Sequence, residues 1–403
     1  MMIKSFAVVV TVALLAAACA PGGAAPSPAG GASPSADPGP GSQASGLPDL
    51  GALRVSTSGW RTDFTRSNVN LADFLSGGPG KDGIPAIDHP EFESIAAART
   101  WLGDRSPVIS LEIGGTARAY PLGVLIWHEI ANDTLADVPV VVTFCPLCNT
   151  ALVFRRDLDG VVYDFGTTGN LRYSDLVMYD RTTETWWQQA TGGAVVGTLT
   201  GAQLTFLPAQ IVSIADFARD HPDGQVLSRK TGYSRDYGSN PYVGYDTVDQ
   251  NPFLFEGVVD GRLPPKERVV TIGEGNAALA LPFSELRKVG VAQVELEGAP
   301  VVILWTPGTA SALNGPTIDE SDDIGSTGVF LPVADGQNLT FRRDGSDESS
   351  RIVDDQTGST WTVTGQAVAG PLNGARLEPM THGDHFWFAW AAFSPQTTIW
   401  QAP

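Results

Sequence analysis

The sequence predicts an α+β protein of two homologous, mostly antiparallel β-rich domains that arose by internal duplication. Three observations lead to this fold class. Short runs of β-branched and aromatic residues, bounded by Gly, Asp or Asn, are the dominant pattern. Segments with helical spacing are few. A series of motifs occurs twice in the same order. We expect residues 84–250 to form the first domain and residues 262–403 to form the second.

The clearest repeat is a strand followed by a proline-containing turn. In the first half, Val138–Phe144 leads into Cys145-Pro-Leu-Cys148; in the second half, Ala299–Trp305 leads into Thr306-Pro-Gly-Thr309. The second turn has hydroxyl groups where the first has thiols. The turn can therefore be built without sulfur, which indicates that the cysteines serve chemistry more than folding.

Further motifs extend the repeat along the chain. The segment 180–186, which starts with Asp and ends with Trp, corresponds to 355–361, and the Gly-rich segment 192–204 corresponds to 365–377. Accidental similarity of β-turn composition is the alternative. Matches that keep the same order favour duplication.

The individual elements follow from periodicity and from flanking turn residues. Alternating or continuous apolar runs predict strands over 108–113, 138–144, 152–154, 161–165, 176–179, 269–272, 301–305 and 351–353. Helical spacing predicts helices over 90–101, 121–130, 211–221, 282–289 and 387–393.

The N-terminus has the pattern of a targeting segment. Residues 1–19 combine a positive start, an apolar stretch and small residues before Cys19, as in a lipoprotein signal peptide whose cysteine is acylated. An ordinary secretory signal, cut near Ala18, is the alternative. Residues 20–47 are rich in Pro, Gly, Ser and Ala, which predicts a flexible tether. We therefore expect a lipid-anchored protein on the extracytoplasmic face of the cell membrane.

The charge balance excludes one class of partner. The chain has 25 Lys plus Arg against 44 Asp plus Glu and a net charge of −19. It lacks the basic clusters that neutralise a phosphate backbone, so we expect no nucleic-acid binding. The expected partners are the membrane, through the lipid anchor, and an unidentified small molecule or protein.

Cys145 and Cys148 are the only cysteines after Cys19. A C-x-x-C turn can hold a soft or borderline metal, here one copper or zinc ion. It can also cycle between dithiol and disulfide, or form a structural disulfide. The turn resembles a metal-binding knuckle, because Asn149 tolerates the left-handed conformation that follows such a turn. Metal binding and redox chemistry stay equally open, and whether the protein is an enzyme stays undecided.

Three histidines are candidates to assist the thiols. His128 lies shortly before the strand that leads to the cysteines, and the second half has no histidine at the matching place. We expect it to act with Cys145 and Cys148, in catalysis or as a metal ligand. His382 and His385 have metal-ligand spacing and are further candidates for the same ion.

Polar side chains after the cysteine turn are candidates to line a ligand cleft: Asn170, Arg172, Ser174, Arg181 and Gln188. On the alternative hypothesis the protein is a non-catalytic module that binds a small ligand or partner, and its cysteines form a structural disulfide. The tyrosine-rich stretch 233–245 is interpreted as a packing face of the linker between the domains.

The combined motifs resemble one family. His128-Glu129 with Asn132-Asp133, Phe144-Cys-Pro-Leu-Cys148 and the segment 174–186 are together similar to the DUF3179 family, exported bacterial and archaeal proteins of unknown function. The similarity covers residues from about Gly83 to the C-terminus. The resemblance implies export but no activity, so it does not choose between a metal site and a redox site.

Overall fold

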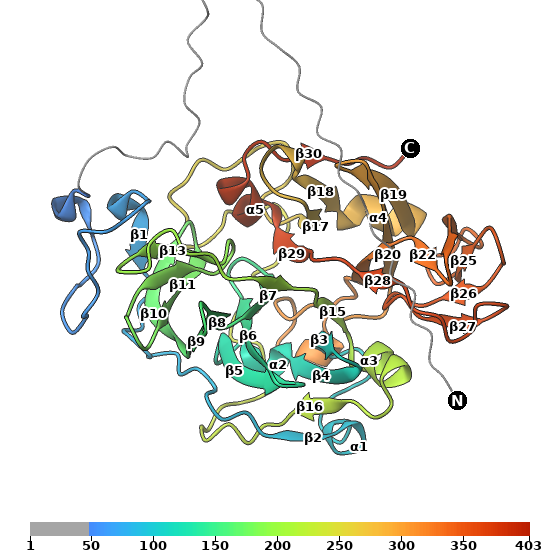
Figure 1. Cartoon of the computed structure of the whole chain (residues 1–403), viewed down its shortest axis with the longest axis horizontal. Helices are drawn as coiled ribbons and strands as arrows, with labels where there is room; N and C mark the ends of the chain where they lie inside the picture. Colours follow the sequence, from blue (N-terminus) through green and yellow to red (C-terminus); the bar gives the residue numbers. More distant parts are fainter. Residues whose placement is uncertain (1–47) are drawn as a thin grey trace, which may run out of the picture. The chain divides into compact units, whose positions relative to one another are not determined.

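Antiparallel strands form most of the regular structure in the computed structural model, which describes residues 48–403 (Figure 1). The predicted signal peptide, Cys19 and the predicted tether lie outside the described residues. Helices are short, from α1 (Ile95–Ala98) to α5 (Trp387–Phe393). None of the helices from residue 48 onward is long and apolar enough to cross a membrane. The mostly β, antiparallel class predicted from the sequence is confirmed.

The largest sheet has eight strands and combines both halves of the chain. Its order is β30 (Thr398–Ile399), β18 (Leu279–Pro282), β17 (Arg268–Ile272), β29 (Gly383–Phe386), β7 (Thr150–Arg155), β6 (Val138–Cys145) and β5 (Ile130–Leu135), and β14 (Phe206–Leu207) also pairs with β7. The two halves meet where Asp384 of β29 pairs with Ala151 of β7 (Figure 1). Because this sheet crosses the predicted boundary, the division into two domains stays a prediction.

Two further sheets belong to the first half. One has the order β15 (Gln210–Ser213), β3 (Pro107–Ile113), β4 (Thr116–Pro121), β16 (Gln225–Leu227) and β2 (Phe92–Ser94). The other has the order β1 (Phe74–Ser76), β10 (Phe165–Arg172), β11 (Asp175–Asp180), β12 (Trp186–Gln188) and β13 (Gly193–Val196). A two-stranded ribbon, β8 (Asp157–Leu158) and β9 (Val161–Val162), accompanies them.

The second half builds smaller sheets of the same kind. One has the order β19 (Val291–Leu296), β20 (Ala299–Thr306), β21 (Ser326–Leu331) and β28 (Glu378–Pro379), and another has β24 (Phe341–Arg343), β25 (Ile352–Asp354), β26 (Thr360–Trp361) and β27 (Ala367–Ala369). The ribbon β22 (Val333–Ala334) and β23 (Gln337–Asn338) lies between them in sequence.

The same pairings recur in the two halves. β15 pairs antiparallel with β3, and β29 pairs antiparallel with β17. β16 pairs parallel with β4, and β30 pairs parallel with β18. A short helix follows the first-named strand of each antiparallel pair: α3 (Ile214–Asp220) follows β15, and α5 follows β29.

One predicted alignment is off by one residue. The sequence matched Asp180 with Asp355, but the hydrogen bonds match it with Asp354. Asp180 accepts from the indole N–H of Trp187 at 3.1 Å, and Asp354 accepts from that of Trp361 at 3.0 Å. Each aspartate also accepts a backbone N–H three residues later, at 2.6 Å. The register in the two segments is therefore set by the buried aspartate.

The predicted helices differ most from the observed ones where tertiary contacts override helical spacing. α5 has the predicted bounds, and α4 (Phe283–Val289) begins one residue later than expected. Only Leu122–Leu125, helix α2, is helical within 121–130, and only α1 within 90–101. The expected strand over 161–165 is also wrong: β9 ends at Val162, and β10 begins at Phe165.

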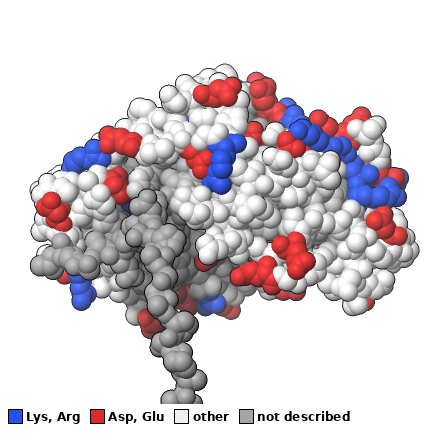
Figure 2. Space-filling view, turned by 90° about the horizontal axis from the view of Figure 1, so that it is seen from above, with Lys and Arg blue, Asp and Glu red and all other residues white. Residues whose placement is uncertain are grey.

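Charged side chains of both signs share the surface. On the face seen in Figure 2, lysines and arginines lie beside acidic side chains. The ion pairs agree with this arrangement, since Arg342 contacts both Asp344 and Asp355, at 3.1 and 3.0 Å. The absence of nucleic-acid binding stays a prediction.

Candidate metal site

The cysteine turn is a tight, fully buried connection between two central strands. β6 ends at Cys145 and β7 begins at Thr150, and these two residues pair across the ladder. The N–H of Asn149 donates to the carbonyl of Pro146 at 3.2 Å, and Asn149 has a φ of 50°. The predicted left-handed residue after the turn is confirmed. Both cysteines are free thiols and at most 1% exposed.

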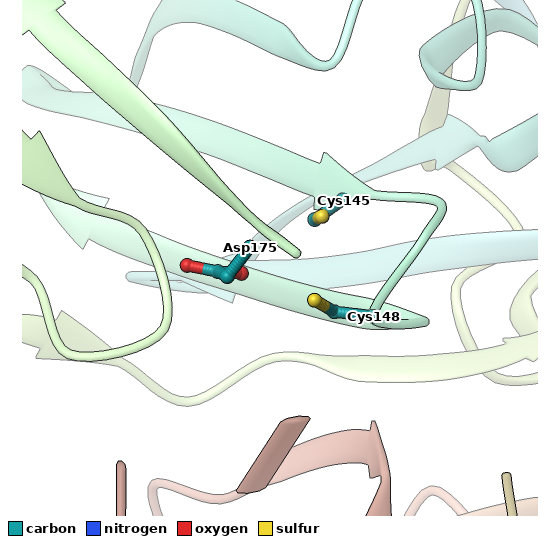
Figure 3. Close-up of side chains that lie close together, drawn as sticks. All are labelled: Cys145, Cys148 and Asp175. Atoms are coloured by element: carbon teal, nitrogen blue, oxygen red, sulfur yellow. The ribbon is translucent and has the colours of Figure 1, made fainter. Parts of the chain in front are cut away.

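A second hairpin brings a carboxylate to the two sulfurs. Tyr173 and Ser174 connect β10 to β11 with φ values of 54° and 67°, the left-handed pair that a tight two-residue hairpin requires. The carbonyl of Ser174 lies 3.8 Å from the Cys145 sulfur. Asp175, the first residue of β11, is thereby placed beside the turn. One ligand atom from each of Cys145, Cys148 and Asp175 lies within 4.8 Å of the others, and the three side chains share one space (Figure 3).

The Asp175 carboxylate accepts N–H hydrogen bonds through one oxygen only, and both thiols lie close enough to interact with it as well. Oδ2 accepts from the Gln188 amide at 2.5 Å and from the Ala190 N–H at 2.9 Å. Oδ1 is buried and has no hydrogen-bond partner among residues 48–403. A buried carboxylate oxygen without a partner is costly, so this atom is free to coordinate an ion.

Two carboxylic acids and two thiols lie close together at this site, without a lysine or arginine among residues 48–403 as partner. Burial raises the pKa of Asp175 to about 6 and that of Glu129 to about 8. Burial likewise raises the pKa of the Cys145 thiol and raises that of the Cys148 thiol well above its usual value. No lysine or arginine of the described chain is among the main causes of these four pKa changes. The cavity around the sulfurs therefore favours either protons or a bound cation.

An irregular segment between β16 and β17 covers the site. The Tyr245 hydroxyl donates to the carbonyl of Leu147 inside the cysteine turn, at 3.1 Å. The Ser174 hydroxyl donates to the carbonyl of Phe253 at 2.6 Å. Tyr242 packs against the same core, and its pKa is raised by burial and by the nearby Glu129 and Cys145 groups. We call residues 240–255 the cover segment.

The cover segment corrects the interpretation of the tyrosine-rich stretch. Tyr242 and Tyr245 are part of the wall of the cysteine site, and Tyr237 contacts His128. Tyr233 alone is largely solvent-exposed, at 47%.

His128 is buried, but the structure does not bring it into the cysteine group. Its Nδ1 contacts the carbonyl of Pro85 at 2.7 Å, and its Nε2 contacts the hydroxyl of Tyr237 at 2.7 Å. Both ring nitrogens are therefore engaged in hydrogen bonds that a metal would have to break. Asp175, not His128, completes the group of three within 4.8 Å.

His382 and His385 lie together on β29 and the turn before it, also outside the cysteine group. They line a separate cavity of about 640 Å³. His385 approaches the cysteine turn only indirectly, because its Nδ1 lies 2.9 Å from the hydroxyl of Thr150.

The five predicted cleft residues divide into two groups. Ser174 and Gln188 adjoin the cysteine site, and the Arg172 guanidinium donates to the side-chain amide oxygen of Gln188 at 3.4 Å. Asn170 and Arg181 lie elsewhere, since Asn170 pairs with Ser76 of β1 and Arg181 forms an ion pair with Asp88 at 2.7 Å.

Sequence reasoning missed Asp175 and Glu129 as site residues. Asp175 stands next to Ser174 in the segment 174–186, but only the hairpin register shows that it faces the sulfurs. Glu129 is distinguished by its backbone conformation, which the sequence does not show. It has a φ of 58°, which is unfavourable for a residue with a side chain, and its backbone N–H donates to the carbonyl of Leu125 at 2.6 Å.

Comparison with known proteins gives the family. The profile described as "Protein of unknown function (DUF3179)" matches residues 81–397. The chain belongs to the DUF3179 family. No curated protein and no solved structure matches the chain. The resemblance predicted from the sequence is confirmed, and in this DUF3179 member the function must be argued from the site itself.

Proposed function

We propose that this DUF3179 protein binds one zinc or copper ion through Cys145, Cys148 and Asp175. One observation carries the proposal: two thiols and a carboxylate, all buried, have ligand atoms within 4.8 Å of one another, and Asp175 Oδ1 has no partner among residues 48–403. A cation would replace the protons that burial otherwise retains on these groups.

The surroundings favour metal binding over thiol–disulfide exchange. Exchange requires an accessible thiolate, and a helix N-terminus commonly lowers the thiol pKa in redox C-x-x-C motifs. Here the turn joins two strands, both sulfurs are at most 1% exposed, and burial raises both thiol pKa values. A dithiol that cycles between oxidation states therefore stays the second candidate.

The ligand types favour zinc over copper(I). Two thiolates suit either ion, whereas a carboxylate oxygen is a common zinc ligand and a poor one for soft copper(I). Three protein ligands leave a fourth tetrahedral position. Glu129, whose charge raises the pKa of Cys145, is a further acid that could serve a bound ion, by coordination or as a proton acceptor.

Cobalt titration tests the proposal. Protein reduced and freed of metal should develop cobalt–thiolate charge-transfer absorption with one equivalent of Co²⁺, and Zn²⁺ should remove it. Cys145→Ser/Cys148→Ser should abolish the signal. His128→Gln is the matched control and should keep the stoichiometry, because His128 is engaged by Pro85 and Tyr237. The proposal would be refuted if His128→Gln lost the cobalt signal while the cysteine variant kept it. A wild-type protein that binds no metal would refute it too.

We further propose that the two halves arose by internal duplication. The recurring pairings and the hydrogen bonds of Asp180 and Asp354 support it. On this alignment Glu129 corresponds to Gly290, which has a φ of 73°, and in both halves the N–H bonds a carbonyl four residues earlier. At the matching positions the second half therefore has Gly290, Thr306 and Thr309. The first half has a strained glutamate and the two cysteines there. Superposition of 84–250 on 262–403 through these strands tests the duplication.

We also propose that Cys19 carries the lipid that anchors the protein on the extracytoplasmic face of the membrane. The targeting pattern of residues 1–19 and the tether composition of 20–47 support this location. Processing should be blocked by globomycin, and Cys19→Ala should leave the detergent phase. A Cys19→Ala protein that still partitions with membranes would contradict the anchor.

A further inference from the structure

A second cavity lies beside the proposed metal site. It is a cavity of about 640 Å³ between the first half and β17, β29 and α5. Glu274, Gly275 and Thr381 at its rim are exposed, whereas His382, Gly383 and His385 are buried. The cavity therefore leads from solvent to a buried polar floor.

The hydrogen bonds of His382 fix which ring nitrogen carries the proton. Its Nδ1 lies 2.8 Å from the carbonyl of Met380, which can only accept, so Nδ1 is the donor. The Nε2 atom is then a bare acceptor. It is buried and has no partner among residues 48–403.

His385 has the same tautomer for a related reason. The Thr150 hydroxyl lies 3.3 Å from the carbonyl of Cys148, to which it donates, and it accepts from His385 Nδ1 at 2.9 Å. Nε2 of His385 therefore carries no proton, and it packs against Gly383. Burial lowers the pKa of His382, and it lowers the pKa of His385 to about 3, so both rings are neutral at physiological pH.

Gly383 makes room for this arrangement. A Cβ atom at position 383 would lie 2.3 Å from His385 Nε2 and 3.1 Å from a methyl group of Leu152. Any side chain there would displace the His385 ring. The ring is also stacked on Trp390, with centroids 5.2 Å apart.

The remaining walls define the ligand class. Leu152, Phe206, Met380 and Trp390 supply apolar surface. The described lining contains no lysine or arginine, and Glu274 stands at the rim, so the cavity does not suit an anion. We infer that this cavity binds a small uncharged organic molecule that has an apolar ring and donates a hydrogen bond to Nε2 of His382.

Three ring compounds of similar size test the inference: phenol, anisole and benzoate. In ligand-observed NMR titrations, phenol should bind with a Kd on the order of 1 mM, as expected for so few atoms. Anisole, which lacks the donor, should bind at least about tenfold more weakly, because it leaves a buried acceptor unpaired. Benzoate should not bind. Long-range ¹H–¹⁵N spectra should show both rings as Nδ1–H tautomers.

Variants separate this site from the metal site. His382→Leu should remove the preference for phenol over anisole, and Gly383→Ala should weaken both. His89→Leu, at an exposed histidine, is the matched control, and Cys145→Ser/Cys148→Ser should bind phenol like wild type. Equal affinity for phenol and anisole, or no phenol binding, would overturn the inference. So would zinc binding that requires His382 and His385.

Discussion

Replacing Asp175 with asparagine should raise the stability of the metal-free protein and reduce the stabilisation that zinc provides. The substitution keeps the size of the side chain and an oxygen that can accept from Gln188 or Ala190. It removes the buried negative charge, and with it one proposed metal ligand.

The expected magnitudes follow from the pKa and from mass action. In the metal-free protein, burial raises the pKa of Asp175 from 3.8 to about 6. Since one pKa unit corresponds to about 1.4 kcal/mol, ionised Asp175 costs up to about 3 kcal/mol at pH 7.5, and Asp175→Asn should regain part of it. Zinc at about 1,000 times the Kd should stabilise the wild type by about 4 kcal/mol. If Asp175→Asn binds zinc about 100-fold more weakly, the same zinc concentration should raise its free energy of unfolding by only about 1.4 kcal/mol.

Denaturant unfolding at pH 7.5, in chelator and in excess zinc, measures both effects. Asp175→Asn should be more stable than the wild type in chelator and should gain less stability from zinc. A variant that gains as much from zinc as the wild type would refute coordination by Asp175. A variant destabilised in chelator would refute the argument from buried charge.

Three further predictions follow from the same site. Burial raises the pKa of Glu129 from 4.5 to about 8, so the stabilisation from its protonated form is complete below pH 4.5 and is lost as the pH rises through 8. In the metal-free protein, Glu129→Gln should therefore reduce the loss of stability between pH 5 and 7.5 by roughly 1.4 kcal/mol per pH unit. An unchanged dependence of stability on pH would contradict this. Cys145→Ala/Cys148→Ala should stay within about 2 kcal/mol of wild type in chelator but lose the entire zinc-dependent gain, whereas a larger loss in chelator would indicate a structural role for the thiols. Both thiols should react with a chromogenic disulfide at least about 100-fold more slowly in the native protein than in denaturant, and Tyr245→Ala should accelerate labelling while Tyr233→Ala should not; fast labelling of the wild type would show that the cover segment does not protect the site.

The sequence was sufficient where local pattern determines structure. The strand–turn unit around Cys145 and the left-handed Asn149 were predicted from residue types alone, and so was helix α5 with its correct bounds. Each of these depends on contacts between residues close in the chain.

The ligand set could not be predicted because it depends on register between distant segments. His128 is near the cysteines in sequence, yet its ring points to Pro85 and Tyr237. Asp175 is about thirty residues away and reaches the sulfurs only because the Tyr173–Ser174 hairpin fixes the start of β11. A strand slipped by one residue would turn Asp175 to the other face.

The most direct test is a crystal structure of protein purified under reducing conditions with zinc, recorded at the zinc absorption edge. Bound zinc should give an anomalous peak about 2.3 Å from the sulfurs of both Cys145 and Cys148 and about 2.0–2.2 Å from an Asp175 oxygen. A Cys145–Cys148 disulfide, or a zinc peak at His382 and His385 with none at the thiols, would contradict it.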